Sequence, residues 1–207
     1  MNVNIKRLSP DAQTPTYAHA TDAGFDLVAA ADVIIEPGAT ACVPTGLAFE
    51  IPEGYEMQIR PRSGITLKTK LRVQIGTVDC GYTGEVGVVV DNIAQAPESV
   101  SRMVKDISGR LIASTDRELH RYNTYIIRKG DRLAQALIKP VEQAVFTEVD
   151  ALGDSDRGAG GFGSSGVIAQ SYEKANERNG SALERLAKEE THLKSIGLTF
   201  DLPKEDA

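Results

Sequence analysis

The sequence is poor in cysteine, histidine and long apolar runs, and each shortage excludes a class of protein. Two cysteines and three histidines among 207 residues provide neither a disulfide framework nor a paired Cys/His zinc site. A bound metal would therefore need oxygen ligands. No apolar run approaches the roughly 20 residues of a membrane-spanning helix, and the N-terminal segment lacks the apolar core of a secretory signal. We expect a cytoplasmic protein with no membrane contact.

Charge narrows the set of ligands. The net charge of −6 repels a polyphosphate backbone at long range, so we expect no direct nucleic-acid binding. An anionic substrate must therefore be held by local groups. The hydrophobic content of 41% over 207 residues is enough to bury a substantial core.

Residues 1 to about 150 have the pattern of an all-β domain. Apolar residues alternate with polar ones along residues 55–59, and a denser valine run at residues 86–90 predicts a strand buried on both faces. Proline and glycine separate these short segments, as in a sandwich or jelly roll. We expect a β domain over residues 1–166.

Two segments depart from this pattern. In residues 97–122, apolar side chains recur at helical spacing (Val100, Met103, Val104 and Ile107), which predicts a helical insertion. Residues 167–207 are polar and begin a second pattern with Ser181 and Glu184 spaced as a capping box. This predicts a partly helical C-terminal extension.

Four segments carry groups suited to a phosphate ligand. Residues 60–64 combine two arginines with a serine and a glycine, and residues 129–135 end on a glutamine that is unusual for a core. A glycine-bounded hairpin at residues 76–85 carries an aspartate and a tyrosine. Residues 157–166 hold glycines, serines and an arginine around Phe162. The backbone amides and the arginine suit an anion, and the lone aromatic ring predicts an arm, 154–166, that closes on a base.

Together these segments resemble the trimeric deoxyuridine triphosphatase (dUTPase) family, including phage-type members with an insertion. The family's five motifs occur in order at residues 23–27, 61–64, 76–84, 130–135 and 157–166. The resemblance implies a jelly-roll homotrimer with shared active sites that hydrolyses dUTP to dUMP and pyrophosphate with Mg²⁺. This reaction limits uracil incorporation into DNA and supplies dUMP for dTMP synthesis.

The same resemblance assigns roles to individual residues. Asp79 matches the general base that directs water at the α-phosphorus, while Asp26 and Gln135 match positions that hold magnesium through water. Tyr82 matches the residue that rejects a ribose 2′-hydroxyl. The substrate-binding positions are Arg62, Ser63, Gly64, Val73, Thr77, Val78, Tyr82, Gly87, Gln135, Arg157, Phe162, Gly163, Ser164 and Ser165.

One position departs from the family pattern. Many relatives carry an asparagine where this chain has Val73, and the asparagine amide contacts uracil. A valine side chain neither donates nor accepts a hydrogen bond. Either backbone and water replace that contact, or the register shifts so that Gln74 supplies it.

Two alternatives remain open at this stage. A dCTP deaminase, or a bifunctional relative, shares the fold, but its catalytic glutamate would fall at Val89. A nucleotide-gated regulatory protein would use the 97–122 insertion to bind a protein partner. In that case we expect deletion of the insertion to spare hydrolysis.

Overall fold

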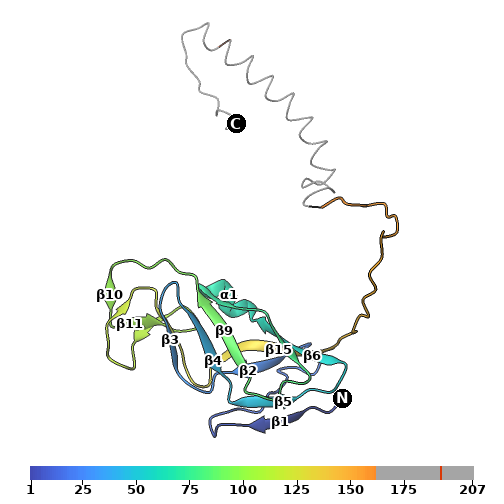
Figure 1. Ribbon diagram of the computed structural model, residues 1–207. Coiled ribbons are helices and arrows are strands. Elements are labelled where there is room, and N and C mark those ends of the chain that lie inside the picture. Colours follow the sequence, from blue (N-terminus) through green and yellow to red (C-terminus); the bar gives the residue numbers. More distant parts are fainter. Residues whose placement is uncertain (162–191, 193–207) are drawn as a thin grey trace. The chain divides into compact units, whose positions relative to one another are not determined.

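The computed structural model of the protein describes residues 1–161 and residue 192 (Figure 1). The chain divides into two compact units, Met1–Phe146 and Thr147–Ala207. The helix and strands of residues 1–161 all lie in the first unit. They are β1 (Asn4–Arg7), β2 (Phe25–Val28), β3 (Val33–Ile35), β4 (Thr40–Pro44), β5 (Leu47–Glu50), β6 (Tyr55–Pro61), α1 (Ser63–Lys68), β7 (Leu71–Val73), β8 (Gly76–Asp79), β9 (Gly87–Asn92), β10 (Val100–Ser101), β11 (Met103–Lys105), β12 (Leu111–Ala113), β13 (His120–Arg121), β14 (Tyr125–Ile127) and β15 (Arg132–Pro140).

The strands form five small sheets around one apolar core. Their orders are β2-β15-β6-β8, β12-β11-β14-β3, β4-β9-β7, β1-β5 and β10-β13. The long pairing of β6 with β15 runs antiparallel from Tyr55 opposite Pro140 to Pro61 opposite Ala134. Fully buried side chains from the larger sheets, including Leu27, Met57 and Val88, fill the interior. The predicted all-β, jelly-roll-like fold is confirmed.

Strand β9 corrects one expectation from the sequence. Val86, Val88 and Val90 are buried, but Val89 is 40% exposed. The strand is therefore buried on one face and not on both. Its side chains alternate because β9 lies in a sheet whose second face is open in this chain.

The insertion at residues 97–122 is β-structure, so the prediction of a helix was wrong. It contains β10 to β13, of which β10 and β11 are labelled in Figure 1. Strand β11 lies in the sheet β12-β11-β14-β3 and pairs in parallel with β14. Of the four residues with helical spacing, only Val104 is buried, opposite Ile112 on β12. A turn around Gly109, where φ is +83°, closes the hairpin. The short apolar run is compatible with both the helical and the strand period. The glycine turn and the pairing with neighbouring strands stabilise the strand conformation here.

The third motif also differs from the expected hairpin. β8 pairs with β6, whereas the next strand, β9, pairs with β4 and β7. Residues 80–86 therefore link two sheets. The predicted helix that begins near Ser181 lies outside the described residues, and the domain boundary at residue 166 stays a prediction.

Within the described part of the chain, no helix has the length and apolarity to cross a membrane. Cys42 and Cys80 are both free thiols.

Candidate active site

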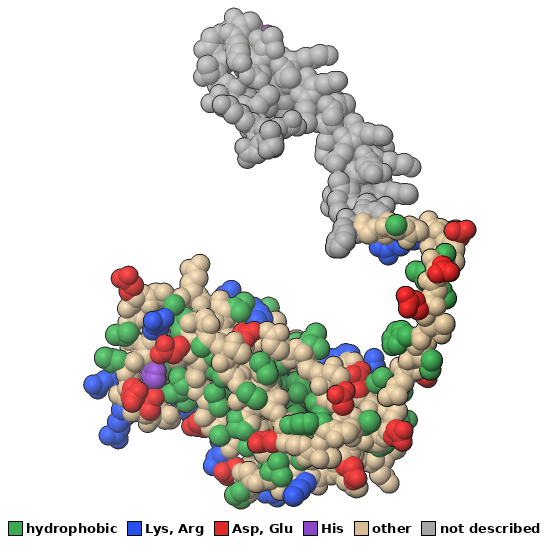
Figure 2. All heavy atoms as spheres, viewed as in Figure 1, with side chains coloured by type: hydrophobic (Ala, Val, Ile, Leu, Met, Phe, Trp, Pro, Cys, Tyr) green, Lys and Arg blue, Asp and Glu red, His purple; other side chains and the backbone are tan. Residues whose placement is uncertain are grey.

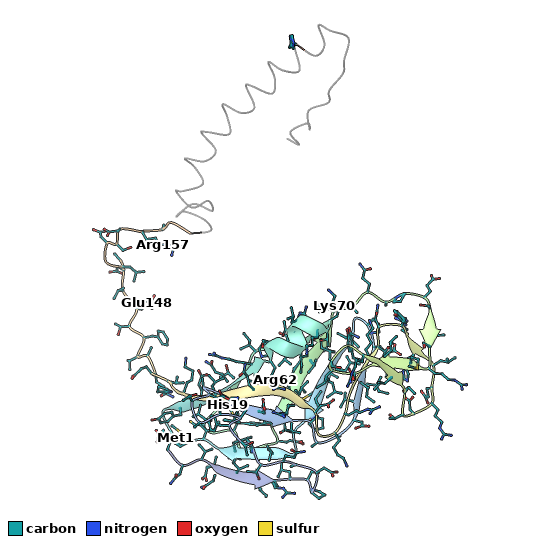
Figure 3. The ribbon with its side chains drawn as sticks, turned by 180° about the vertical axis from the view of Figure 1, so that it is seen from behind. Met1, His19, Arg62, Lys70, Glu148 and Arg157 are labelled. Atoms are coloured by element: carbon teal, nitrogen blue, oxygen red, sulfur yellow. The ribbon has the colours of Figure 1, made fainter. Side chains whose placement is uncertain are left out.

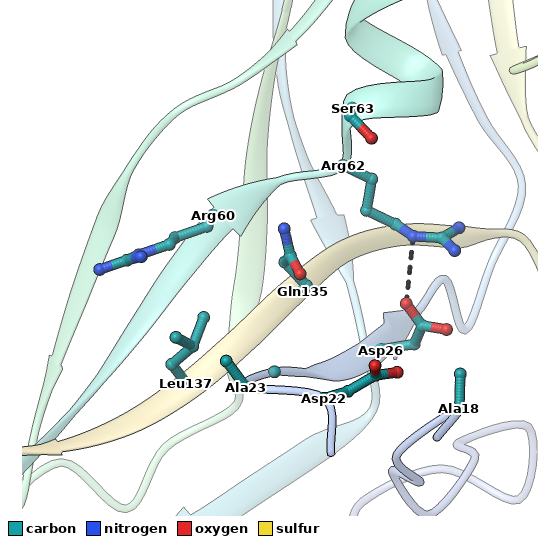
Figure 4. Close-up of a pocket in the computed structure, with 10 residues that line it drawn as sticks. Ala18, Asp22, Ala23, Asp26, Arg60, Arg62, Ser63, Gln135 and Leu137 are labelled. Carbon is teal, nitrogen blue, oxygen red and sulfur yellow. Dashed lines mark ion pairs between the residues drawn. The ribbon is translucent and has the colours of Figure 1, made fainter. Parts of the chain in front are cut away.

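A cavity of about 440 Å³ opens at one end of the sheet β2-β15-β6-β8 (Figure 4). Its walls come from the loop before β2, the end of β6, the start of α1 and the middle of β15. The lining residues are Ala18, Asp22, Ala23, Gly24, Asp26, Arg60, Arg62, Ser63, Gln135 and Leu137. The fold thus brings together Asp26, Arg62, Ser63 and Gln135, which the sequence places in the first, second and fourth motifs.

Asp26, on β2, lies between two arginines. Its carboxylate oxygens are 3.1 Å from Arg62 Nε and 3.4 Å from Arg132 Nη1. Arg62 also donates a hydrogen bond from Nη1 to the Arg132 carbonyl oxygen at 2.8 Å. A guanidinium has five N–H donors, so Asp26 orients Arg62 and leaves it able to bind an anion. Arg132 then serves mainly to anchor this pair.

Gln135 lies at the centre of the same sheet. In register it stands opposite Asp26 on β2 and opposite Arg60 on β6. Its Nε2 donates to the Pro61 carbonyl oxygen at 3.0 Å. A Cβ at Gly24 would lie 3.3 Å from Gln135 Oε1 and 3.1 Å from the Ala136 carbonyl oxygen. Glycine at position 24 therefore lets the first motif approach the fourth.

The turn that leads into β15 has its own acidic residue. Asp131 Oδ2 accepts a hydrogen bond from the Arg128 backbone N–H at 2.8 Å. Burial raises the pKa of Asp131 above its ordinary value, against the opposing effect of that hydrogen bond. Gly130 precedes it with φ of +93°, a conformation that favours glycine. These two residues of the fourth motif shape the chain and do not line the cavity.

The second motif contains a helix that the sequence did not indicate. α1 begins at Ser63, with Arg62 as its N-cap residue, and it is six residues long. A helix of this length is too short to produce a periodic apolar pattern. The first N–H groups of a helix have no partner within it, and a Cβ at Gly64 would meet no atom within 4 Å. The first turn therefore offers donors beside open space.

The third motif lines a different cavity of about 490 Å³, together with residues of β6 and its preceding loop. Asp79 is the last residue of β8, and its side chain is exposed. Its carbonyl oxygen accepts a hydrogen bond from the Tyr82 N–H at 3.0 Å, which closes a tight turn. Thr77 and Cys80 line the same cavity. The candidate base is accessible to solvent and to ligands.

Tyr82 is held by the turn that follows it. Its hydroxyl donates to the Glu85 carbonyl oxygen at 2.9 Å, and Glu85 Oε1 in turn accepts from the Gly46 N–H at 2.8 Å. A Cβ at Gly84 would lie 2.6 Å from the Tyr82 hydroxyl. The glycine lets the ring fold back onto the turn, and Tyr82 as a whole is 48% exposed, so its ring is held in one orientation that ligands can reach.

The positions expected to read the base offer mainly backbone. Val73 and Val78 are buried in the core, and a Cβ at Gly87 would overlap Cys42 Sγ. Gln74 is exposed, but its amide is hydrogen-bonded to Asp91. Hydrogen bonds from Thr40 and Gln74 lower the pKa of Asp91. The Asp91 carboxylate is therefore ionised, and in that form it accepts the hydrogen bond from the Gln74 amide.

Within one chain the two groups of residues lie apart. Asp79 stands opposite Glu56 on β6, whereas Gln135 stands opposite Arg60, four residues further along the same strand. At 3.3 Å per residue this is about 13 Å along the strand. Asp26 on β2 and Asp79 on β8 are also separated across the order β2-β15-β6-β8, about 14 Å at the usual strand spacing. Within residues 1–161 of a single chain, Asp79 and the group of Asp26, Arg62 and Gln135 therefore line two different cavities.

The fifth motif is described only in part. Arg157 lies in the second unit, where its Nε donates to the Gly160 carbonyl oxygen at 2.7 Å. Phe162, Gly163, Ser164 and Ser165 lie outside the described residues. Their contacts with a nucleotide stay predictions.

Two charged lining residues, Asp22 and Arg60, were not predicted from the sequence as site residues. Asp22 accepts a hydrogen bond from the backbone N–H of His19 at 3.0 Å. His19 is labelled in Figure 3, as is Arg62 of the same cavity wall. Arg60 donates to Gln58 Oε1 from Nη2 at 2.6 Å. Asp22 lies in the loop before β2, four residues before Asp26 in the sequence. That spacing matches no ligand motif, so nothing in the sequence singled out Asp22. Arg60 belongs to segment 60–64, and its positive charge was one of the features that marked this segment as suited to a phosphate.

The described residues contain no group of three or more His, Cys, Asp or Glu side chains placed to hold a metal. The side-chain oxygen donors at the first cavity are the carboxylates of Asp22 and Asp26, the amide of Gln135 and the hydroxyl of Ser63. Mg²⁺ usually binds proteins through one or two carboxylates and keeps several waters, completing its shell with substrate phosphates. This donor set fits such an ion.

Comparison with known proteins identifies one family. The family model described as dUTPase matches residues 10–102 and 120–166, and most of the insertion falls in the gap between them. The deoxyuridine 5′-triphosphate nucleotidohydrolase of Thermobifida fusca (strain YX) is 43% identical over 178 residues, covering 84% of each chain.

Two solved structures are also similar. A mutant dUTPase of Staphylococcus bacteriophage 80alpha with dUpNHpp is 35% identical, with a TM-score of 0.76 over 80% of this chain and 99% of that one. A mutant dUTPase of phage phi11 of S. aureus, described as coordinating a structural Mg(II) ion, is 34% identical, with a TM-score of 0.71 over 74% of this chain and 100% of that one. The chain therefore belongs to the dUTPase family.

Proposed function

We propose that this protein is a dUTP diphosphatase, which hydrolyses dUTP to dUMP and pyrophosphate. The observation that carries the proposal is the cavity that gathers Asp26, Arg62, Ser63 and Gln135 from three separate motifs. The relative from Thermobifida fusca is named for this activity, and the phage 80alpha relative was solved with dUpNHpp. The reaction limits uracil incorporation into DNA and supplies dUMP for dTMP synthesis.

The chemistry needs no nucleophilic side chain. Arg62, Ser63 and the first-turn amides of α1 bind the phosphates, and Asp79 accepts a proton from the attacking water. The water oxygen bonds to the α-phosphorus, and the bond from that phosphorus to the bridging oxygen of the β-phosphate breaks. The products are dUMP and pyrophosphate. A positioned general base of this kind contributes about 10²- to 10⁴-fold in rate.

Magnesium is the proposed cofactor, held by the triphosphate and, through water, by Asp26 and Gln135. When bound, the ion neutralises phosphate charge and fixes the phosphate chain. Both oxygens of Asp26 already face guanidinium groups, which favours contact through water over direct ligation. Asp22 adds a second carboxylate to the same wall.

Uracil and deoxyribose are recognised at the third motif in this proposal. The buried side chains of Val73 and Val78 leave their backbone groups, with those of Thr77 and Gly87, to meet the base. Gln74 is bonded to Asp91, so a register shift that brings Gln74 to uracil is not favoured. Tyr82 excludes a ribose 2′-hydroxyl by shape.

The active site is proposed to form between protomers of a homotrimer. The separation of Asp79 from Asp26 along and across one sheet supports this, because a single chain leaves the base away from the phosphate-binding groups. Exposed apolar side chains supply a second reason: Val145 and Phe146 are each 94% exposed. Segment 141–152 also carries Val149 and Leu152, and Figure 2 shows hydrophobic side chains along it. Such a segment needs a partner surface, and Arg157 to Ser165 follow it as the proposed closing arm.

The alternative functions are less well supported. A dCTP deaminase would need a carboxylate at Val89, a half-exposed valine on β9. A regulatory role through the insertion is compatible with hydrolysis, since β10 to β13 present exposed Val100, Leu111 and Leu119.

A pyrophosphate-release assay tests the proposed function. Wild type and Asp79→Asn are compared on dUTP, dTTP, dCTP and UTP with Mg²⁺, and ammonia release is followed with dCTP. We expect a strong preference for dUTP that the variant loses by at least about 10²-fold. Equal turnover of UTP would contradict the role of Tyr82, and ammonia release would favour the deaminase.

A further inference from the structure

The turn of the insertion lies against the end of α1. A Cβ at Gly109 would be 2.7 Å from the carbonyl oxygen of Lys68, the last residue of α1. Real Cβ atoms do not approach a backbone oxygen so closely, so the two backbones touch at a point where only glycine fits. The positive φ of Gly109, +83°, imposes the same residue independently.

The turn itself is held in one conformation by hydrogen bonds and an ion pair of Asp106. Asp106 Oδ1 accepts hydrogen bonds from the backbone N–H groups of Ser108 and Arg110 at 2.8 and 3.0 Å. Asp106 Oδ2 forms an ion pair with Arg110 at 3.2 Å. Burial opposes ionisation of Asp106, but the hydrogen bonds from Ser108 and Arg110 outweigh it and lower the pKa. We call residues Asp106–Gly109 the insertion turn.

A second attachment joins the insertion to the residues that follow α1. The Lys105 N–H, at the end of β11, donates to the Thr124 carbonyl oxygen at 2.8 Å. The next residue, Tyr125, is buried on β14, and its hydroxyl accepts from the Lys70 N–H at 3.1 Å. Arg62 and Lys70, labelled in Figure 3, flank α1 on its two sides in the sequence. The C-terminal end of α1 is therefore fixed from two directions.

The other end of the same helix carries the phosphate-binding residues. α1 has six residues, about 9 Å at 1.5 Å per residue, so a displacement at Lys68 is passed on to its first turn. A cavity of about 210 Å³ lies between the two elements. It is lined by Arg62, Ser63, Gly64, Ile65 and Lys68 and by Ile107 and Ser108 of the insertion turn.

We propose that the insertion turn is a positioning element for the triphosphate: it presses on Lys68 and so sets where α1 holds Ser63 and Gly64. The inference rests on the proposed function, because it takes these residues to bind phosphate. It assigns the insertion a part in hydrolysis and replaces the expectation that the insertion can be deleted without effect. Gly109 is a positioning residue and touches no substrate.

Gly109→Ala tests the inference, with Gly38→Ala as its matched control. Gly38 has φ of +78°, and a Cβ there would meet no atom within 4 Å. Both substitutions therefore bring the same backbone strain, but only Gly109→Ala pushes on α1. We expect kcat/KM for dUTP to fall about 10-fold in Gly109→Ala, mainly through KM, and to stay within about twofold in Gly38→Ala.

Hydrogen exchange provides the readout that does not depend on activity. Amides of residues 63–69 should exchange faster in Gly109→Ala than in Gly38→Ala or wild type. If Gly109→Ala does not fold, Asp106→Ala loosens the same turn, and Asp106→Asn restores an acceptor for the two N–H groups. KM should rise in Asp106→Ala and return toward wild type in Asp106→Asn.

The outcomes separate this inference from the proposed function. Wild type that fails to release pyrophosphate from dUTP contradicts the proposed function. An active enzyme whose KM and exchange at residues 63–69 are unchanged in Gly109→Ala overturns the positioning role alone. An equal rise of KM in Gly38→Ala overturns it too, because the effect would then come from loss of stability.

Discussion

Asp26 shows how single residues build the candidate site. Its carboxylate sits between Arg62 and Arg132, so an acidic residue fixes the basic group that meets the phosphate. With side chains 17% and 33% exposed, Asp26 and Arg62 are partly screened from water, where a charge pair is stronger than at a free surface. A phosphate bound by Arg62 would lie close to the Asp26 carboxylate, and the proposed Mg²⁺ would offset the repulsion between the two anions.

Val73 provides a test at the residue scale, because many relatives carry asparagine at this position. The side chain is 7% exposed and packs in the core. We expect Val73→Asn to lower the free energy of unfolding by about 2–4 kcal/mol, since it buries an amide without a designed partner. Urea unfolding measures this, with Val73→Ala as the control that removes only apolar contacts.

The same variant tests how uracil is read. If backbone groups meet the base, the preference for dUTP over dCTP should not rise in Val73→Asn. A variant of unchanged stability with a higher preference for dUTP would mean that the side chain at position 73 faces the nucleotide.

At the scale of elements, the insertion has its own polar core. His120 is 6% exposed, and its Nε2 lies 3.0 Å from both Ser114 Oγ and Asp116 Oδ1. Asp116 also accepts from the Glu118 backbone N–H at 3.0 Å. Hydrogen bonds from Ser114, Glu118 and His120 lower the pKa of Asp116 from 3.8 to about 2. The ionised carboxylate therefore helps to hold the loop between β12 and β13.

The lowered pKa of Asp116 predicts how the stability of the insertion changes when the pH falls. A carboxyl group with a lowered pKa in the folded state stabilises the fold above its ordinary pKa and loses that contribution as pH falls through the folded value. We expect the loop at residues 114–120 to lose order between pH 3.8 and about 2. NMR of these residues during acidification measures it, and Asp116→Asn, which cannot titrate, is the control. A loop that changes alike in both proteins would refute the assignment.

The sequence predicted the strands better than the insertion. Alternation at Tyr55, Met57 and Ile59 gave β6, because one face of that strand packs on the core. At Val104 a short apolar run satisfied two periods, and only pairing with β12 and β14 decided between them. The helix α1 left no pattern because it is six residues long.

Site residues could be predicted from the sequence where their side chains have charged or polar groups within a recognisable motif. Arg62, Asp26 and Gln135 were identified through motifs, and the fold brings them to one cavity. The contact of Gly109 with Lys68 had no sequence signal, because it joins backbone atoms of two elements 41 residues apart.

At the scale of the whole molecule, the proposed active site takes residues from more than one chain. The cavity with Arg62 and the cavity with Asp79 share no lining residue, although both border β6. In the proposed C₃ assembly, the first cavity of one protomer would face the third motif of its neighbour at every site. We expect the exposed apolar residues of segment 141–152 to become buried in such an assembly.

Mixed trimers test the central claim most directly. Arg62→Ala and Asp79→Asn are each expected to be inactive alone, and the two chains are co-expressed with different affinity tags and purified as mixed assemblies. If each site takes Arg62 from one chain and Asp79 from another, every mixed trimer restores about one site in three, and dUTP hydrolysis returns to roughly a third of the wild-type rate per chain. Mixed assemblies that remain inactive would contradict the account, because they would place both residues of each site on the same chain.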